Sequence, residues 1–274
     1  MEKKEPKIKI LVACHKADPA IRQDDIYMPI HVGKALHPEL DLGFQGDDTG
    51  DNISEKNGSY CELTAMYWAW KNLPKDVDIV GLCHYRRYFD ITETEIKVCL
   101  SKYDVIIPDP NILAWPLEKE LALWTSLEDV YLLIEILRLR FPEYRNIIDD
   151  YFFTSNKFYR LNMFLMSRRE FNCYCEFLFD ILYEFEKKSR EYPYCRQRRV
   201  YGYLGEILMG VWINIYMKKF YKTYVNEPGA TKLKRLIIGI RNYLSFVIIN
   251  PRRIKPQKPV LTGLEIDGYI LSTY

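Results

Sequence analysis

Residues 78–87 read DIVGLCHYRR, a short apolar run that gives way at once to histidine and arginine side chains. An apolar run of this length, bounded by polar residues, is typical of a buried strand. Residues 9–14, KILVAC, repeat the arrangement and are followed by His15 and Lys16. Sheets of parallel strands bind their ligands beyond the carboxyl ends of the strands, so these two endings are the first candidates for a functional site.

Strands and helices alternate along the rest of the chain. The remaining predicted strands cover residues 42–44, 104–108 and 162–166. The predicted helices cover residues 60–71, 128–140, 168–188 and 204–219. In the first helix apolar residues recur at helical spacing, and the second follows Ser126 as its N-cap. The alternation predicts an α/β sandwich with a mainly parallel central sheet.

The composition is that of a soluble globular protein. The 274 residues are 48% hydrophobic and 28% charged, which excludes disordered, collagen-like and coiled-coil classes. Seven cysteines, an odd number, and an N-terminus without an apolar signal sequence predict reduced thiols and a cytoplasmic location. Cys173 and Cys175 have no second Cys/His pair at zinc spacing, so we predict no zinc site.

A net charge of +2 conceals an uneven distribution. Residues 231–258 hold eight of the 39 basic residues and no acid, which leaves 31 basic against 37 acidic residues elsewhere, a net charge of −6. The eight are Lys232, Lys234, Arg235, Arg241, Arg252, Arg253, Lys255 and Lys258. Such basic segments are typical of contacts with anionic surfaces. We therefore predict a catalytic or binding body, residues 1–225, and a basic helical extension with a tail, residues 226–274.

The extension is also amphipathic. Its apolar residues recur at helical spacing: Leu233, Leu236, Ile237, Ile240, Leu244, Val247 and Ile248. The apolar run 236–250 has 15 residues and is interrupted by Arg241, whereas a transmembrane helix needs about 20. We predict that the helix lies on an anionic membrane surface rather than crossing the membrane. The alternative is that it packs on the body or on a second subunit, and the sequence leaves the oligomeric state open.

Several strings of the body resemble one bacterial family. The most specific are residues 60–65, YCELTA, and residues 81–89, GLCHYRRYF. Accompanying matches are residues 48–54, Lys56-Asn57, residues 162–164, residues 199–203, Glu206 and Trp212, in family order over roughly residues 7–220. The family is encoded in capsule, exopolysaccharide and O-antigen clusters and was long described only as a domain of unknown function.

The resemblance implies a glycosyltransferase with a GT-A-like nucleotide-sugar-binding fold. The donor would be a UDP-sugar, with UDP-galactofuranose as one candidate, because some members are linked to galactofuranose transfer. The acceptor would be a lipid-linked or oligosaccharide glycan at the inner face of the bacterial plasma membrane. Residues 111–127 depart from the His- and Tyr-rich loop expected of the family, since they contain no His, and this leaves the acceptor open.

Cationic residues are the candidates for binding a diphosphate leaving group. His84, Arg86 and Arg87 follow the strand at 78–83, whereas the nearest Asp-x-Asp pair, at 76 and 78, precedes it and lies at the wrong end for a metal site. Guanidinium groups bind phosphate oxygens in bidentate geometry, so they can take the place of a metal. We expect no required cofactor, with Mg²⁺ or Mn²⁺ as the alternative. Arg86 and Arg87 could instead pair with surface carboxylates, and His84 could be a core residue.

The remaining candidates contact substrate or transfer protons. His15 lies where GT-A-like proteins begin their nucleotide pocket, and Asp48 and Asp51 could accept hydrogen bonds from ribose, uracil or sugar hydroxyls, or ligate Mg²⁺. The family strings add Asn52, Asn57, Tyr60, Glu62 and Asn162 as substrate-binding residues. Alternatively, the Asp, Asn and Gly residues of the 48–52 loop are present because tight turns favour them, and Asn57 could be a helix N-cap.

Glu206 is the candidate base of an inverting transfer, in which a carboxylate deprotonates the acceptor hydroxyl. It follows residues 199–205 and is predicted to lie near the start of an apolar helix. A glutamate there could equally be favoured by the helix dipole alone. Glu62 is the second candidate for the base, unless it braces Arg86 or Arg87.

Three other classes of function compete with this one. The first is a noncatalytic nucleotide-sugar- or glycan-binding scaffold of a polysaccharide assembly complex, which would not hydrolyse a nucleotide-sugar. A nucleic-acid-binding module is disfavoured because the body is acidic and no helix-turn-helix, zinc-finger or ribonucleoprotein motif is present. A serine hydrolase is disfavoured because the chain contains no Gly-x-Ser-x-Gly.

Overall fold

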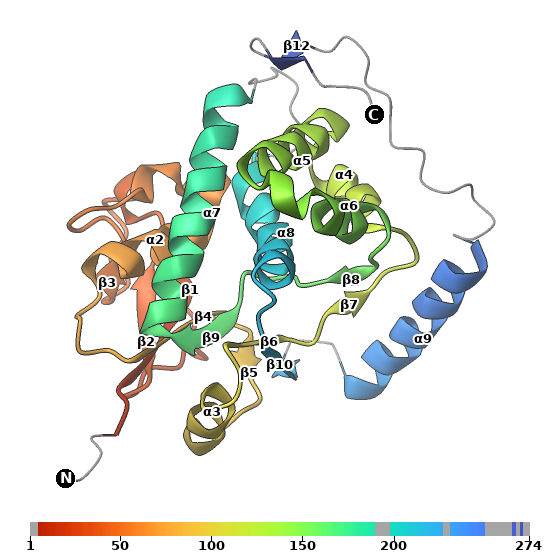
Figure 1. Ribbon diagram of the computed structural model, residues 1–274. Helices are drawn as coiled ribbons and strands as arrows, with labels where there is room; N and C mark the ends of the chain where they lie inside the picture. The colour runs from red at the N-terminus through yellow and green to blue at the C-terminus, as the bar shows by residue number, and fades with distance from the viewer. Residues whose placement is uncertain (1–4, 190–197, 227–230, 250–264, 267–268, 271–274) are drawn as a thin grey trace.

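A seven-stranded mixed sheet forms the centre of the molecule (Figure 1). The computed structural model describes residues 5–189, 198–226, 231–249, 265–266 and 269–270. The strands in spatial order are β10 (Phe220–Thr223), β6 (Val105–Pro108), β9 (Phe164–Ser167), β4 (Ile79–His84), β1 (Ile8–Cys14), β2 (Tyr27–His31) and β3 (Gln45–Gly46). All neighbouring strands run parallel except β9, which is antiparallel to both β4 and β6. The predicted α/β fold with a mostly parallel sheet is confirmed.

The sheet is buried on both faces. Alternate residues of β1 point to opposite sides, so that Leu11 and Ala13 join one hydrophobic cluster and Ile10 and Val12 join another. Strands buried on both faces are expected to be apolar throughout, which explains the continuous apolar runs in the sequence.

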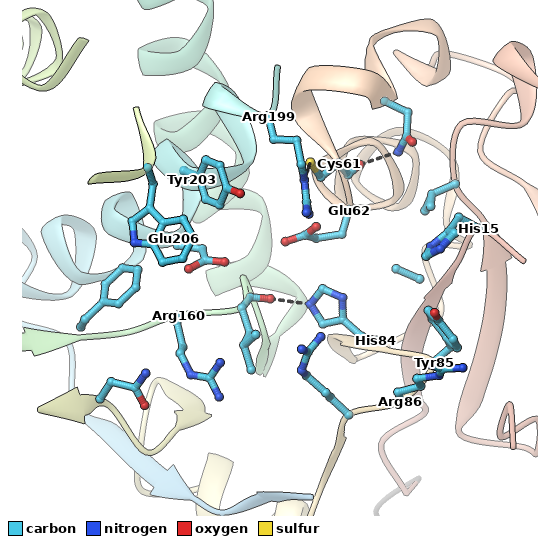
Figure 2. Close-up of a pocket in the computed structure, with 18 of the residues that line it drawn as sticks. His15, Cys61, Glu62, His84, Tyr85, Arg86, Arg160, Arg199, Tyr203 and Glu206 are labelled. Atoms are coloured by element: carbon cyan, nitrogen blue, oxygen red, sulfur yellow. Dashed lines mark hydrogen bonds between the residues drawn. The ribbon is translucent and has the colours of Figure 1, made fainter. Parts of the chain in front are cut away.

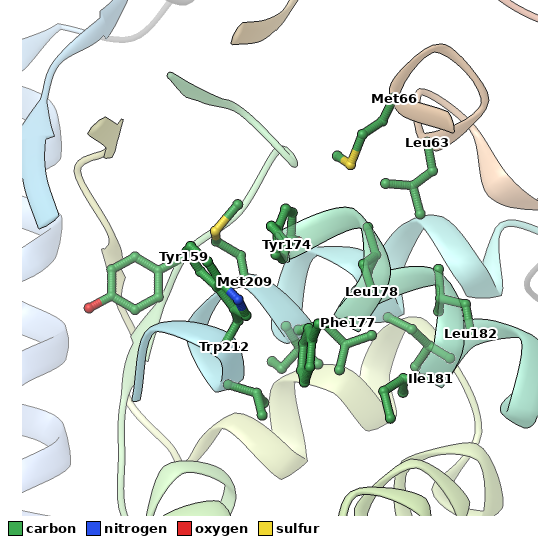
Figure 3. Packing of buried hydrophobic residues seen from close by; sticks show 14 of the residues in the cluster. Leu63, Met66, Tyr159, Tyr174, Phe177, Leu178, Ile181, Leu182, Met209 and Trp212 are labelled. Carbon is green, nitrogen blue, oxygen red and sulfur yellow. The ribbon is translucent and has the colours of Figure 1, made fainter. Parts of the chain in front are cut away.

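Helices cover the larger face. They are α1 (Asn57–Tyr60), α2 (Leu63–Asn72), α4 (Leu117–Trp124), α5 (Leu127–Arg140), α6 (Arg145–Phe153), α7 (Arg168–Lys188) and α8 (Val200–Ile215), while α3 (Glu93–Leu100) packs on the other face. Figure 3 shows aromatic and aliphatic side chains of α7 and α8, with Tyr174 and Trp212 among them, packed into one cluster. Three short 3₁₀ turns lie at Lys34–Leu36, Ser54–Lys56 and Pro142–Tyr144.

Two small strand pairs lie outside the central sheet. β5 (Tyr88–Phe89) pairs with β11 (Val225–Asn226), and β7 (Asn111–Ile112) pairs with β8 (Lys157–Phe158). The helix α9 (Lys232–Ile249) stands beside β7, apart from the helices that cover the sheet (Figure 1). A last pair joins β12 (Glu265–Ile266) to β13 (Tyr269–Ile270).

Several predicted elements differ from the observed ones. Residues 42–44 are not a strand. The sheet instead continues from β1 to β2, a strand that was not predicted from the sequence, and ends at the short β3. The helix predicted at 60–71 is divided at Cys61, whose φ of 54° is left-handed and interrupts helical hydrogen bonding. The helix predicted at 168–188 has the bounds of α7, and the other predicted strands and helices are present with shifted ends.

The amphipathic helix of the extension is confirmed as α9. Its seven predicted apolar residues are each between 45% and 66% exposed, so within the described chain they do not pack on the body. Arg252, Arg253, Lys255 and Lys258 lie outside the described residues. No helix among the described residues has the length and apolar character needed to cross a membrane.

Candidate active site

A cleft of about 930 Å³ opens at the carboxyl ends of β1 and β4 (Figure 2). His15 directly follows β1, and His84 ends β4, where it lies beside Ala13 in the strand register. Tyr85, Arg86 and Arg87 continue from β4 into the same cleft. The two polar endings selected from the sequence therefore meet, as the rule for parallel strands predicts.

The antiparallel strand β9 brings a third segment to this edge. Because β9 runs against its neighbours, the residues that precede it lie at the carboxyl ends of β4 and β6. Arg160 and Leu161 line the cleft there. Leu161 and Asn162 have φ values of 82° and 50°, a left-handed conformation that is costly for residues other than glycine. The turn presents the Leu161 carbonyl to His84, whose Nε2 lies 2.7 Å away.

One face of α8 forms the opposite wall. Arg199 precedes the helix, and Tyr203 and Glu206 follow at spacings of four and seven residues, so all three point to the same side. Gly202 and Gly205 let the helix approach the turn at Cys61: added Cβ atoms would lie 3.0 Å from Cys61 Sγ and 2.9 Å from a Leu63 methyl group. Arg199 Nε donates a hydrogen bond to Cys61 Sγ over 3.0 Å.

Two carboxylates, Glu62 and Glu206, face the cleft from these walls (Figure 2). Glu62 is fixed by Asn162, whose Nδ2 donates to Glu62 Oε1 over 2.8 Å and to the Gly202 carbonyl over 3.0 Å. Burial, reinforced by the charge of Glu62, raises the pKa of Glu206 to about 8. A backbone hydrogen bond from Leu161 and the charges of Arg160 and Arg199 oppose this rise without cancelling it. A pKa near neutrality is typical of a group that accepts and returns a proton.

The position of Glu206 corrects the prediction about its helix. Glu206 is the seventh residue of α8, two turns from its beginning, whereas the effect of the helix dipole falls off within the first turn. The dipole would also lower the pKa of a glutamate, and the pKa of Glu206 is raised. The helix dipole alone therefore does not account for this residue.

Cationic side chains surround the carboxylates. Arg86, Arg87, Arg160 and Arg199 line the cleft, together with the imidazole ring of His84. Arg86 also forms the surface ion pair that the sequence left open: its Nε and Nη2 lie 3.1 Å and 3.0 Å from Asp18 Oδ2. Burial, followed by the charges of Lys16, Arg199 and Arg86, lowers the pKa of His15. The cleft therefore favours an anionic ligand.

The far end of the cleft is aromatic. The Trp124 ring lies against Tyr203 with ring centroids 5.5 Å apart. Glu120 holds two indoles, accepting hydrogen bonds from Trp115 Nε1 over 2.7 Å and from Trp124 Nε1 over 3.1 Å. Trp115, Glu120 and Trp124 belong to the segment 111–127 that departs from the family's expected loop. An indole ring beside a carboxylate is a surface on which the apolar face of a sugar can stack while its hydroxyls are hydrogen-bonded.

Five predicted substrate-binding residues do not line this cleft: Asp48, Asp51, Asn52, Tyr60 and Asn162. Asn52 closes the turn through hydrogen bonds to the Asp48 and Gly50 carbonyls, and Asp51 accepts one from Tyr67. Tyr60 is buried with its hydroxyl 3.2 Å from Glu186. Asn162 is buried outside the cleft lining, where its side chain donates a hydrogen bond to Glu62.

Asn57 lines the cleft but is not an N-cap. It is the first residue of α1, where its Nδ2 donates to the Cys61 carbonyl over 2.7 Å and thereby supports the turn that carries Glu62. The neighbouring Asp47 is fully buried and accepts hydrogen bonds from Gly33, Lys34, Ser54 and Thr64. These contacts give the loop of residues 46–57 a structural role.

The sequence reading missed Arg160, Tyr203, Glu120 and Trp124 as cleft residues. Arg160 could not be placed because the antiparallel direction of β9 has no local signal in the sequence. Tyr203 could have been found from its spacing of three residues to Glu206 on a helix. Within the described part of the chain, no three His, Cys, Asp or Glu side chains are grouped so that they could hold a metal ion.

Comparisons with known proteins give the family of the chain and a similar fold. Residues 9–219 match the family described as Domain of unknown function (DUF4422). The chain is also similar to the apo structure of WbbM, a bifunctional glycosyltransferase, with 29% sequence identity and a TM-score of 0.72. That match covers 82% of this chain and 46% of the WbbM chain, so this chain spans less than half of that protein. No curated protein matches the chain.

Proposed function

The chain belongs to the DUF4422 family, and from that premise we propose that it is a glycosyltransferase with a GT-A-like fold. The proposal is supported by the likeness to WbbM and by one observation in the cleft: two carboxylates stand opposite a group of cationic side chains. Transfer of a sugar from a nucleotide-sugar needs both, because a base must take the acceptor's proton while positive groups stabilise the departing diphosphate.

In the proposed reaction, Glu206 on α8 accepts the proton, and Arg86 and Arg87 at the end of β4 stabilise the leaving group. The acceptor hydroxyl oxygen attacks the anomeric carbon, its proton passes to Glu206, and the bond from that carbon to the diphosphate breaks. The electron pair of that bond leaves with the nucleoside diphosphate, whose developing charge is stabilised by Arg86 and Arg87 from the β4 end. His84 Nε2 is held by the Leu161 carbonyl, which orients the ring and turns Nδ1 away from that contact. Attack from the side opposite the leaving group makes the transfer inverting.

The donor in this proposal is a UDP-sugar, with UDP-galactofuranose as one candidate. The test is a thermal-shift panel of nucleotide-sugars followed by a transfer assay with lipid-linked and oligosaccharide acceptors. A donor should stabilise the fold by mass action, and the same donor should be consumed when acceptor is present. Binding without hydrolysis or transfer for any acceptor would instead indicate the noncatalytic scaffold. Absence of binding across the panel would contradict both.

The aromatic end of the cleft is the proposed acceptor site. Trp124→Ala should raise the KM for a saccharide acceptor at least ~5-fold, the scale of one aromatic contact of about 1 kcal/mol, with little change in the KM for the donor. Leu123→Ala is the matched control, since Leu123 lies on the same helix and is 64% exposed outside the cleft. A larger effect on donor than on acceptor would place the donor sugar at this end instead.

We further propose that α9 binds an anionic membrane surface. Its exposed face combines seven apolar residues with Lys232, Lys234 and Arg241, and exposed apolar patches of this kind mark interaction surfaces. Lipid-linked acceptors lie at the inner face of the bacterial plasma membrane, so binding there would concentrate the enzyme near its substrate.

Vesicle co-sedimentation tests this surface. Wild type should sediment with anionic vesicles, not with neutral ones, and should be released at high salt. Replacing Lys232, Lys234, Arg235 and Arg241 by Glu should abolish binding, because each basic residue near the surface contributes ~1 kcal/mol. A variant with Lys75→Glu and Lys102→Glu, exposed lysines on the body, should sediment like wild type. Equal behaviour of wild type and the α9 variant would assign the helix to packing on a second subunit.

A further inference from the structure

A second cavity, of about 1020 Å³, lies between α9 and the strand β7, and we call it the α9 groove. Its floor is formed by residues 109–113 with Lys222 and Tyr224, and its outer wall is one side of α9. Asn111 and Arg160 line both the α9 groove and the catalytic cleft. The two cavities therefore adjoin at β7, and a ligand long enough could occupy both.

The amino-terminal end of the α9 groove is strongly cationic. Arg160, Lys222, Lys232, Lys234 and Arg235 line it, against a single lining carboxylate, Asp109. Lys232 and Arg235 both contact the Tyr224 ring, since Lys232 Nζ and Arg235 Cζ lie 4.8 Å and 5.1 Å from its centroid. Lys232 also pairs with Asp90 at 3.0 Å, but the side chains are 70% and 47% exposed, and surface pairs of this kind contribute little to stability.

The groove turns apolar beyond these cations. Leu236, Ile240 and Leu244 follow Lys232 at spacings of four residues, so they form a row along one side of the helix. From Leu236 to Leu244 this row extends ~12 Å at the rise of an α-helix. The helix is held over the floor of the groove by Asn242, whose Nδ2 donates to the Ile112 carbonyl over 2.9 Å.

From these features we infer that the α9 groove binds a lipid diphosphate, the anchor of a lipid-linked acceptor. The diphosphate lies against Lys232 and Arg235, and the start of the hydrocarbon chain follows Leu236, Ile240 and Leu244. The saccharide attached to the diphosphate passes β7 at Asn111 and enters the cleft. This inference rests on the proposed function for the identity of the saccharide, but the binding of the anchor is a separate property of α9.

Isothermal titration of the full chain with farnesyl diphosphate tests the groove, with and without saturating UDP in the catalytic cleft. Wild type should bind the probe in both conditions. Lys232→Glu and Arg235→Glu should each weaken binding at least ~10-fold, since each loses a charge-assisted contact and introduces repulsion. Farnesol and inorganic diphosphate, each offering half of the ligand, should bind at least ~10-fold more weakly. The matched control is Lys102→Glu, the same kind of charge change at an exposed lysine of the body that does not line the groove.

The outcomes separate this inference from the proposed function. Absence of farnesyl diphosphate binding, loss of binding on addition of UDP, or equal weakening by Arg235→Glu and Lys102→Glu would overturn the groove assignment. Unchanged melting temperatures of the variants establish that a loss of binding is local. If the probe binds as expected but no sugar is transferred in any assay, the groove stands and the glycosyltransferase proposal fails. If sugar is transferred and the probe does not bind, the glycosyltransferase proposal stands and the groove assignment fails.

Discussion

Glu206→Gln should abolish most sugar transfer while leaving the fold and the affinity for the donor nucleotide intact. Glutamine keeps the size and hydrogen-bonding oxygen of the side chain but cannot accept the proton of the acceptor hydroxyl. Loss of a positioned general base costs ~10²- to 10⁴-fold in rate. The measurement is kcat with a saturating donor, together with the melting temperature and the dissociation constant for UDP. Glu176→Gln, an exposed glutamate of α7, is the matched control and should have no effect.

The pH dependence gives a second readout of the same residue. A general base works as the carboxylate, so kcat/KM of wild type should rise with pH and level off above the Glu206 pKa of about 8. At pH 7 ~10% of a group with that pKa is ionised. Glu206→Gln should lose this rising limb along with the activity.

Glu62→Gln distinguishes the two carboxylates. The charge of Glu62 raises the pKa of Glu206, so removing that charge should move the rising limb to lower pH. If Glu62→Gln instead removes the limb while Glu206→Gln retains it, the base is Glu62. Asn162 fixes Glu62 through a hydrogen bond of 2.8 Å. Asn162→Ala should therefore move the rising limb in the same direction as Glu62→Gln, but by less, because the charge of Glu62 is still present.

The sequence predicts those parts of the site that depend on local pattern. An apolar run followed by polar residues locates both the end of β1, with His15, and the end of β4, with His84 and Arg86. Parallel pairing then brings these endings together without further information, because neighbouring parallel strands end at the same edge. The placement of Glu206 on a helix likewise follows from local pattern, although that helix begins earlier than predicted.

Features that depend on tertiary pairing could not be predicted in this way. Arg160 reaches the cleft because β9 is antiparallel, and strand direction is decided by partners distant in sequence. The loop with Asp48, Asp51 and Asn52 has the composition of a ligand-binding loop, yet the Asn52 side chain closes the turn and Asp51 accepts a hydrogen bond from Tyr67. Acidic and amide residues serve both purposes, so composition does not discriminate between them. The strand β2 was missed because its Pro29 and polar neighbours weaken the apolar pattern.

Arg86→Ala and Arg87→Ala should each reduce transfer at least ~100-fold, the scale of one preorganised group that stabilises developing charge. Both residues line the cleft at the end of β4, where a diphosphate would lie between them and His84. Arg86 also pairs with Asp18, so its loss could act through that ion pair alone. Asp18→Ala separates the two effects, since it removes the pair and leaves the guanidinium. If Arg86 binds the leaving group, Asp18→Ala retains most activity; if it serves only the pair, the two variants lose activity equally.

The proposed roles of Arg86 and Arg87 also predict how sugar transfer responds to chelators. If the guanidinium groups carry the charge stabilisation, EDTA should leave the transfer rate largely unchanged, and added Mg²⁺ or Mn²⁺ should not rescue Arg86→Ala or Arg87→Ala. Arg87→Lys should restore part of the rate at most, because an ammonium group cannot bind two phosphate oxygens in the planar geometry of a guanidinium. An absolute requirement for Mg²⁺ or Mn²⁺, with near wild-type activity in both alanine variants, would show that Arg86 and Arg87 do not stabilise the leaving group. The metal would then have to be bound with help from the donor's phosphates, since Asp48 and Asp51 lie outside the cleft lining.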